Sequence, residues 1–380
     1  MPKIHITLVG GQPTPVYQGI IHSKPDIVIL VCSKMSIEQA ENIKNELTRS
    51  QDNTCQYRTC LINDSDISIM KSDIDKLFLS LSQEEDLSIN LSGGMKIWSV
   101  LFYKTFINRE LSDIYCIGQN GELFDIINER TEKVAFDMDT QFRLLGQKIK
   151  SYTSLEEYDE EDNDALNIIL KLFRSSSHDI FKKLTSEFYK KYCGNATADS
   201  SIFNKQLSHD INNDSISWQP DDNSFILNIR NNEYILSSRN IRSLVLNTGW
   251  FEYYVALKLA KIYGKENIRM NCKFANAKDR DKNEVDVIVK TPTKLMFVEC
   301  KTQVHNSTDV DKFNSVVRNY GGLGSKAFFV TYNKMTTEAN EKCNDYHIKT
   351  SFIYQPHLSL IESEKHWKNT LKDIEKSWNV

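Results

Sequence analysis

Long hydrophobic runs, paired cysteines and a net positive charge are all missing from this sequence. No run approaches the roughly 20 apolar residues of a membrane-spanning helix, and the start "MPKIHITLVGGQP" lacks the apolar core and cleavage site of a signal peptide. The eight cysteines are scattered without a C-x-x-C pair, which argues against a disulfide framework and against a zinc site. These absences predict a cytoplasmic protein with reduced cysteines and no contact with a membrane.

The charge balance does not point to a polyanion partner. The formal net charge is −4, although a local basic groove on an acidic protein can still bind nucleic acid. A chain of 380 residues is too long for one ordinary core, so two or three domains are expected.

The order of apolar patterns predicts two α/β units. Within residues 1–145, strand-like runs alternate with helical periodicity, which is typical of a parallel sheet, and a hairpin is expected to turn at Asn120-Gly121. Residues 146–238 follow an acidic composition shift and are expected to form a linker or middle region with helices and a hairpin turning at Asn231-Asn232. Residues 239–380 begin a second α/β unit.

Two acids and a lysine interrupt the apolar strands of this second unit, in "EVDVIVKTPTKLMFVECKT". Side chains alternate along a strand, so Glu299 and Lys301 point to one face and Cys300 points to the other. A turn at 291–293 brings Asp286 near Glu299, where two carboxylates repel each other unless a cation lies between them. Mg²⁺ or Mn²⁺ suits such an oxygen site. The alternative is an edge strand with surface charges, which the apolar context disfavours because buried unpaired carboxylates are costly.

This pattern resembles the PD-(D/E)xK nuclease superfamily, in which an acid, a hairpin and Glu-x-Lys follow one another; the proline of that signature is absent here. The resemblance implies that Asp286 and Glu299 hold the catalytic metal, with the Cys300 carbonyl as a further ligand. It also implies that Lys301 assists the attack on the phosphate. The superfamily often adds an acid from the preceding helix, and Glu252 fits by its order in the chain, although it also fits a helix-surface glutamate.

Two glycine-rich loops follow strands in the N-terminal unit. Ligands of open α/β sheets bind beyond the carboxyl ends of the strands, where glycines allow close approach and helix N-terminal amides attract phosphate. The expected ligand residues are, in the first loop, Gly11, Gln12, Pro13, Thr14 and Pro15, and, in the second, Asn90, Ser92, Gly93, Gly94, Met95 and Lys96. Neither loop is G-x-G-x-x-G or G-x-x-x-x-G-K-[ST], so a dinucleotide oxidoreductase or a P-loop NTPase is disfavoured. Tight turns without a ligand are the alternative.

Together the two loops resemble those of the CARF domain, the Rossmann-like sensor of proteins linked to type III CRISPR defence. The order of sensor, middle region and PD-(D/E)xK domain resembles the CRISPR ancillary nucleases over essentially the whole chain. This resemblance implies a homodimer that binds cyclic oligoadenylate, with cyclic tetra-adenylate favoured, across its two-fold axis. It implies metal-dependent cleavage of single-stranded DNA or RNA, or nicking of duplex DNA. Two alternatives stay open: an inactive cyclic-nucleotide sensor, and a restriction or repair nuclease that no nucleotide controls.

Overall fold

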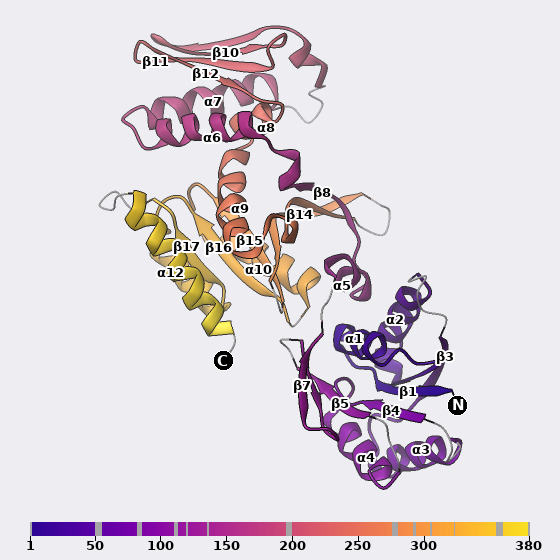
Figure 1. Cartoon of the computed structure of the whole chain (residues 1–380). Coiled ribbons are helices and arrows are strands. Elements are labelled where there is room, and N and C mark those ends of the chain that lie inside the picture. The colour runs from indigo at the N-terminus through magenta and orange to yellow at the C-terminus, as the bar shows by residue number, and fades with distance from the viewer. Residues whose placement is uncertain are drawn as a thin grey trace.

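Three β-sheets organise the chain (Figure 1). The computed structural model describes residues 2–49, 55–81, 86–109, 113–118, 121–134, 137–194, 200–275, 280–291, 294–304, 306–322, 324–354 and 360–378. Within these ranges no helix is long and apolar enough to cross a membrane.

The first sheet forms the N-terminal domain. Its strands are β1 (Lys3–Leu8), β2 (Ile27–Cys32), β3 (Gln56–Leu61), β4 (Asp86–Asn90), β5 (Asp113–Ile117), β6 (Glu122–Asp125) and β7 (Arg130–Lys133). Over the described residues their order is β3-β2-β1-β4-β5-β6-β7, parallel up to β5 and antiparallel from there. The antiparallel pair β5 and β6 confirms the predicted hairpin, although Asn120 of its predicted turn lies outside the described residues.

Helices cover both faces of this sheet, which explains why its central strands are apolar along their whole length. Side chains of α1 (Pro13–Ser23) and α2 (Ile37–Arg49) pack on one face, around Val28 and Leu30. Side chains of α3 (Ile67–Leu79) and α4 (Lys96–Phe106) pack on the other, around Ile6 and Ile29.

The C-terminal domain is built on a sheet with one distant strand. Its strands are β8 (Ile149–Ser154), β13 (Ile268–Ala275), β14 (Asp281–Lys290), β15 (Leu295–Lys301), β16 (Lys326–Thr331) and β17 (Lys349–Phe352). In the described part of the chain the order is β17-β16-β15-β14-β13-β8, with β15, β16 and β17 parallel to one another. The strand β8 therefore completes this sheet from a segment that was expected to belong to the middle region.

Five helices of the described chain pack on the two faces of this sheet. Those on one face are α9 (Gly249–Tyr263) and α12 (Leu360–Trp378), and those on the other are α5 (Met138–Leu144), α10 (Thr308–Gly321) and α11 (Thr337–Asp345). The break between α8 (Ile241–Leu246) and α9 confirms the helix interruption expected before Gly249.

The middle module forms a third, antiparallel sheet over helices. It consists of α6 (Glu160–Phe173), α7 (His178–Tyr192), α8, and the strands β9 (Leu207–Ile211), β10 (Asp214–Gln219), β11 (Ser224–Ile229) and β12 (Asn232–Ser237). Its core is continuous with that of the C-terminal domain: the ring centroids of Phe173 and Trp250 lie 4.3 Å apart, and those of Phe173 and Tyr332 lie 5.3 Å apart.

The predicted turn at Asn231-Asn232 is wrong by one residue. Ile229 pairs with Asn232, so the turn consists of Arg230 and Asn231, with φ angles of 52° and 61°. Two-residue hairpins favour positive φ at both positions because that backbone matches the strand twist. Arginine accepts this conformation here while its amide donates to an Asp214 carboxylate oxygen at 2.8 Å.

Helix α5 connects the N-terminal and C-terminal domains, and Figure 1 shows it between them. On one side Arg143 forms a two-pronged ion pair with Glu46 of α2, with its Nε 2.7 Å from Oε2 and its Nη2 2.6 Å from Oε1. On the other side Asp139 accepts hydrogen bonds from Arg269 of β13, and Phe142 packs with its ring centroid 5.3 Å from that of Phe274. One short helix thus contacts both domains.

Candidate functional site

The acids of the C-terminal domain lie where β14 and β15 stop pairing. The antiparallel ladder runs from Lys290 opposite Leu295 to Val287 opposite Val298, and Asp286 and Glu299 follow at the next position. There the Asp286 carboxylate accepts a hydrogen bond from the Cys300 amide at 2.7 Å. A hairpin register therefore brings the two carboxylates to neighbouring positions.

A single ammonium group lies between these carboxylates. Lys301 Nζ is 2.6 Å from Glu299 Oε1 and 3.5 Å from Asp286 Oδ2. Charged pairs at such distances gain from a low local dielectric, and both acid side chains are largely shielded from solvent, at 14% and 16% exposure. The lysine occupies the place where a shared cation was expected.

The electrostatics of the site show an excess of buried negative charge. Burial, followed by the charge of Asp286, raises the pKa of Glu252 in the first turn of α9 to about 9. Burial and Asp286 raise the pKa of Glu299 to about 7, although Lys301 acts in the opposite direction, and burial raises the pKa of Asp286 as well. One lysine therefore does not neutralise three acids, and a further cation would stabilise their ionised forms.

The donor set fits a hard divalent cation. Among the described residues no group of three or more His, Cys, Asp or Glu side chains is already arranged to hold a metal ion. Mg²⁺ is commonly bound through only one or two carboxylates together with water and substrate phosphate, so Asp286 and Glu299 suffice as its protein anchors. The Cys300 side chain is no candidate, because it is buried in the apolar core and burial raises the pKa of its thiol.

The two glycine-rich loops of the N-terminal domain lie in contact with each other. A Cβ atom on Gly10 would lie 2.7 Å from the Gly94 amide nitrogen, and one on Gly93 would lie 1.9 Å from the Leu8 carbonyl oxygen. Gly94 also has a φ of +69°, a conformation that glycine adopts without strain. The close approach of the backbones explains why glycines follow both strands.

Asn90 and Ser92 brace these loops through their side chains. Asn90 donates to the Pro15 carbonyl oxygen at 3.1 Å and accepts from the Ser92 amide at 2.9 Å. The Ser92 hydroxyl in turn accepts from the Ile117 amide at 2.6 Å. The polar groups of both residues are therefore engaged within the protein.

The remaining predicted ligand residues surround two helix N-termini. Those at the start of α1 are Gly11, Gln12, Pro13, Thr14 and Pro15, and those at the start of α4 are Gly93, Gly94, Met95 and Lys96. Neither Gln12 nor Met95, the residues that precede these helices, caps the helix with its side chain. Free amides, the exposed Lys96 and the open surface at Gly11 together form an environment that attracts anions.

Two neighbours of the nuclease site have no signal in the sequence. Lys182 of α7 donates to the Gln303 side chain at 3.3 Å, so the middle module reaches the segment that follows Lys301. Tyr158 stacks on Tyr253 with ring centroids 4.1 Å apart, and burial, followed by the charge of Glu252, raises the pKa of its hydroxyl. Both contacts join segments far apart in the chain, which local patterns do not predict.

Comparisons with known proteins agree with this division of the chain. A family model described as "Card1 CARF domain" matches residues 4–158, and one described as "Card1-like, endonuclease domain" matches residues 239–354. The structure of Can2 from Sulfobacillus thermosulfidooxidans in complex with cyclic tetra-adenylate has a TM-score of 0.69 at 16% identity, over 98% of each chain. Protein VC1899 from Vibrio cholerae has a TM-score of 0.72 at 15% identity, over 97% of this chain and 98% of that one.

Structural likeness at such low identity shows a shared fold, and no curated protein matches the sequence. The two family matches carry the assignment, and they confirm the predicted order of a CARF domain followed by a nuclease domain. The chain is a nuclease of the Card1 type, with its CARF domain at residues 4–158 and its endonuclease domain at residues 239–354.

Proposed function

We propose that the protein is a cytoplasmic endonuclease that uses Mg²⁺ or Mn²⁺ and that cyclic oligoadenylate activates. The observation that carries the catalytic half of this proposal is the Lys301 ammonium group between Asp286 and Glu299. Two buried acids that share a cation at the end of a hairpin are suited to hold a metal beside a phosphodiester.

Each residue of this site has a separate part in the proposal. Asp286 and Glu299 hold the metal, with Glu252 and the Cys300 carbonyl as further ligands. A bound Mg²⁺ or Mn²⁺ supplies charge neutralisation at the scissile phosphate and lowers the pKa of the attacking water. Lys301, once another cation replaces it between the carboxylates, donates to a phosphate oxygen and stabilises the charge that develops there.

The N-terminal loops are proposed to bind the activator. The related Can2 structure contains cyclic tetra-adenylate, and in this chain the uncapped starts of α1 and α4, together with Lys96, are suited to its phosphates. Asn90 and Ser92 hold the loops in place, while the residues Gly11 to Pro15 and Gly93 to Lys96 contact the ring.

A homodimer is proposed because α4 carries an exposed apolar face beside these loops. Ile97, Val100, Tyr103 and Ile107 recur at helical spacing and are 37%, 61%, 41% and 42% exposed. Apolar side chains that gather on one helix face favour burial against a second protein surface. A two-fold symmetric ring then lies where the loops of two subunits meet.

The experiment that tests the proposed function is cleavage of plasmid DNA and of single-stranded DNA and RNA oligonucleotides. Cleavage is expected only with Mn²⁺ or Mg²⁺ and to increase with cyclic tetra-adenylate. The variant Glu299→Ala should bind the activator without cleaving. Full activity in excess EDTA would refute the metal mechanism, and cleavage indifferent to the nucleotide would indicate an ungated restriction or repair nuclease. Binding of the nucleotide without any cleavage would indicate an inactive sensor.

A further inference from the structure

A polar pocket opens at the carboxyl edge of the C-terminal sheet, close to Lys301. Because β15, β16 and β17 are parallel, their carboxyl ends lie on the same edge, where ligands of such sheets bind. Lys301 pairs with Thr331, the last residue of β16, and Thr331 pairs with Phe352, the last residue of β17. The pocket surrounds these two strand ends and has a volume of about 370 Å³.

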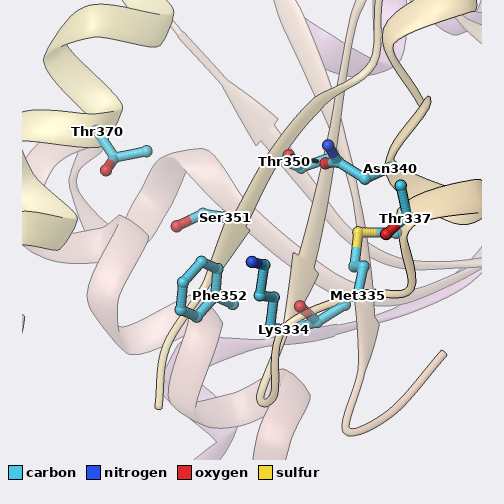
Figure 2. A pocket seen from close by; sticks show the side chains of 9 residues that line it. Lys334, Met335, Thr337, Asn340, Thr350, Ser351, Phe352 and Thr370 are labelled. Atoms are coloured by element: carbon cyan, nitrogen blue, oxygen red, sulfur yellow. Dashed lines mark hydrogen bonds between the residues drawn. The ribbon is translucent and has the colours of Figure 1, made fainter. Parts of the chain in front are cut away.

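The lining of this pocket is rich in hydrogen-bonding groups and free of acids. The lining residues are Thr331, Lys334, Met335, Thr337, Asn340, Thr350, Ser351, Phe352 and Thr370. Figure 2 shows Lys334 between Phe352 and Met335, with its ammonium group directed into the space that they border. A cation, an aromatic ring and several hydroxyls without a carboxylate are suited to an anionic ligand that also has a flat ring.

The Thr331 hydroxyl indicates that something polar belongs in this pocket. Thr331 is only 1% exposed, and its Oγ1 has no hydrogen-bond partner within the described residues. A buried hydroxyl without a partner is unfavourable unless a ligand or water supplies one. Nearby, the Thr350 hydroxyl donates to Asn340 Oδ1 at 3.2 Å, which leaves the Asn340 amide nitrogen to donate to a ligand.

We propose that this pocket binds one nucleotide of the substrate strand, adjacent to the phosphate at Lys301. The inference rests on the proposed nuclease function. Neighbouring strands lie about 5 Å apart, so the pocket begins about one strand spacing from the Lys301 backbone and extends to about two. The Phe352 ring stacks on the base, Asn340 and the hydroxyls bind polar groups of base and sugar, and Lys334 binds a phosphate. Since a base in a duplex is stacked and paired, the nucleotide must be single-stranded or unstacked to enter.

The test compares two pocket variants with a lysine variant outside the pocket. Full-length Lys334→Ala and Thr331→Val are compared with Lys349→Ala, which changes a lysine of β17 that does not line the pocket. The probe is a labelled single-stranded DNA or RNA oligonucleotide. Its affinity is measured by fluorescence anisotropy in EDTA, and its KM by cleavage with Mn²⁺ and cyclic tetra-adenylate.

Lys334→Ala is expected to weaken oligonucleotide binding by about fivefold or more, as for loss of a charged contact, and Lys349→Ala to leave it unchanged. Thr331→Val separates a ligand role from a structural one. It removes an unpartnered hydroxyl, so the melting temperature should stay level or rise while the KM increases. An oligonucleotide with abasic sites should bind wild type at least about fivefold more weakly, and Phe352→Ala should lose this discrimination.

The outcomes distinguish this inference from the function on which it rests. If wild type cleaves no probe under any condition, the proposed function fails. If wild type cleaves, but Lys334→Ala and Thr331→Val bind and cleave with unchanged affinity and KM, the pocket is not a nucleotide subsite. Equal binding of the abasic and the intact probe by wild type would also overturn the stacking role of Phe352.

Discussion

Replacing Arg143 by methionine should loosen the junction between the CARF domain and the endonuclease domain. The Glu46 side chain is only 6% exposed, whereas that of Arg143 is 29% exposed. Without the guanidinium group Glu46 keeps the Thr140 hydroxyl, 3.2 Å away, as a donor to Oε1. Breaking a fully buried pair costs about 3–5 kcal/mol. Because Arg143 is partly solvated and Thr140 remains, we expect a loss of about 2–3 kcal/mol in the free energy of unfolding.

A double-mutant cycle measures this pair directly. Glu46→Gln removes the charge that Arg143→Met leaves unpaired, so the double variant should be more stable than the sum of the single losses predicts, by about 2 kcal/mol. Urea unfolding followed by circular dichroism gives the four stabilities. The same proteins are then assayed for activation by cyclic tetra-adenylate, and reduced activation with unchanged nucleotide affinity is expected if α5 carries the coupling. Stabilities that add within about 0.5 kcal/mol would refute the reasoning about the buried carboxylate.

Three further substitutions test the two sites. Lys301→Ala should lower the cleavage rate about a hundred- to a thousandfold without changing affinity for the cyclic nucleotide, which single-turnover cleavage and calorimetry check. Lys96→Ala should weaken nucleotide binding about tenfold and shift the activation curve to higher concentration; an unmoved curve would contradict the proposed ligand loops. Gly93→Ala should lower stability by about 1–3 kcal/mol or more, since its Cβ would lie 1.9 Å from the Leu8 carbonyl oxygen. Gly11→Ala, with nothing within 4 Å of its Cβ, is the matched control and should change stability by less than about 0.5 kcal/mol.

Local patterns were enough to place the nuclease acids. Asp286 and Glu299 belong to one hairpin, so alternation along the strands and a short turn determine that they become neighbours. The glycine loops were also accessible from the sequence, because a glycine after a strand indicates a close approach of backbones.

Contacts between distant segments were not accessible in the same way. The contact of Lys182 with Gln303 joins residues 121 positions apart, and neither residue belongs to a motif. The pairing of β8 with β13 was missed because the segment Ile149–Ser154 has a mixed, half-exposed pattern that is typical of an edge strand and equally of a loop. For Arg230, a side chain that rarely adopts positive φ gave no sign of a turn.

The pairing of β8 with β13 has a consequence for how the polypeptide acquires its shape during synthesis. The whole middle module is inserted between two strands that lie side by side, so β8 leaves the ribosome long before its partner exists. Until then it is an unpaired strand, available to pair with other chains. A fragment that starts at residue 239 would lack β8 and expose the edge of β13, so the recombinant endonuclease domain should aggregate unless residues 149–154 are supplied with it.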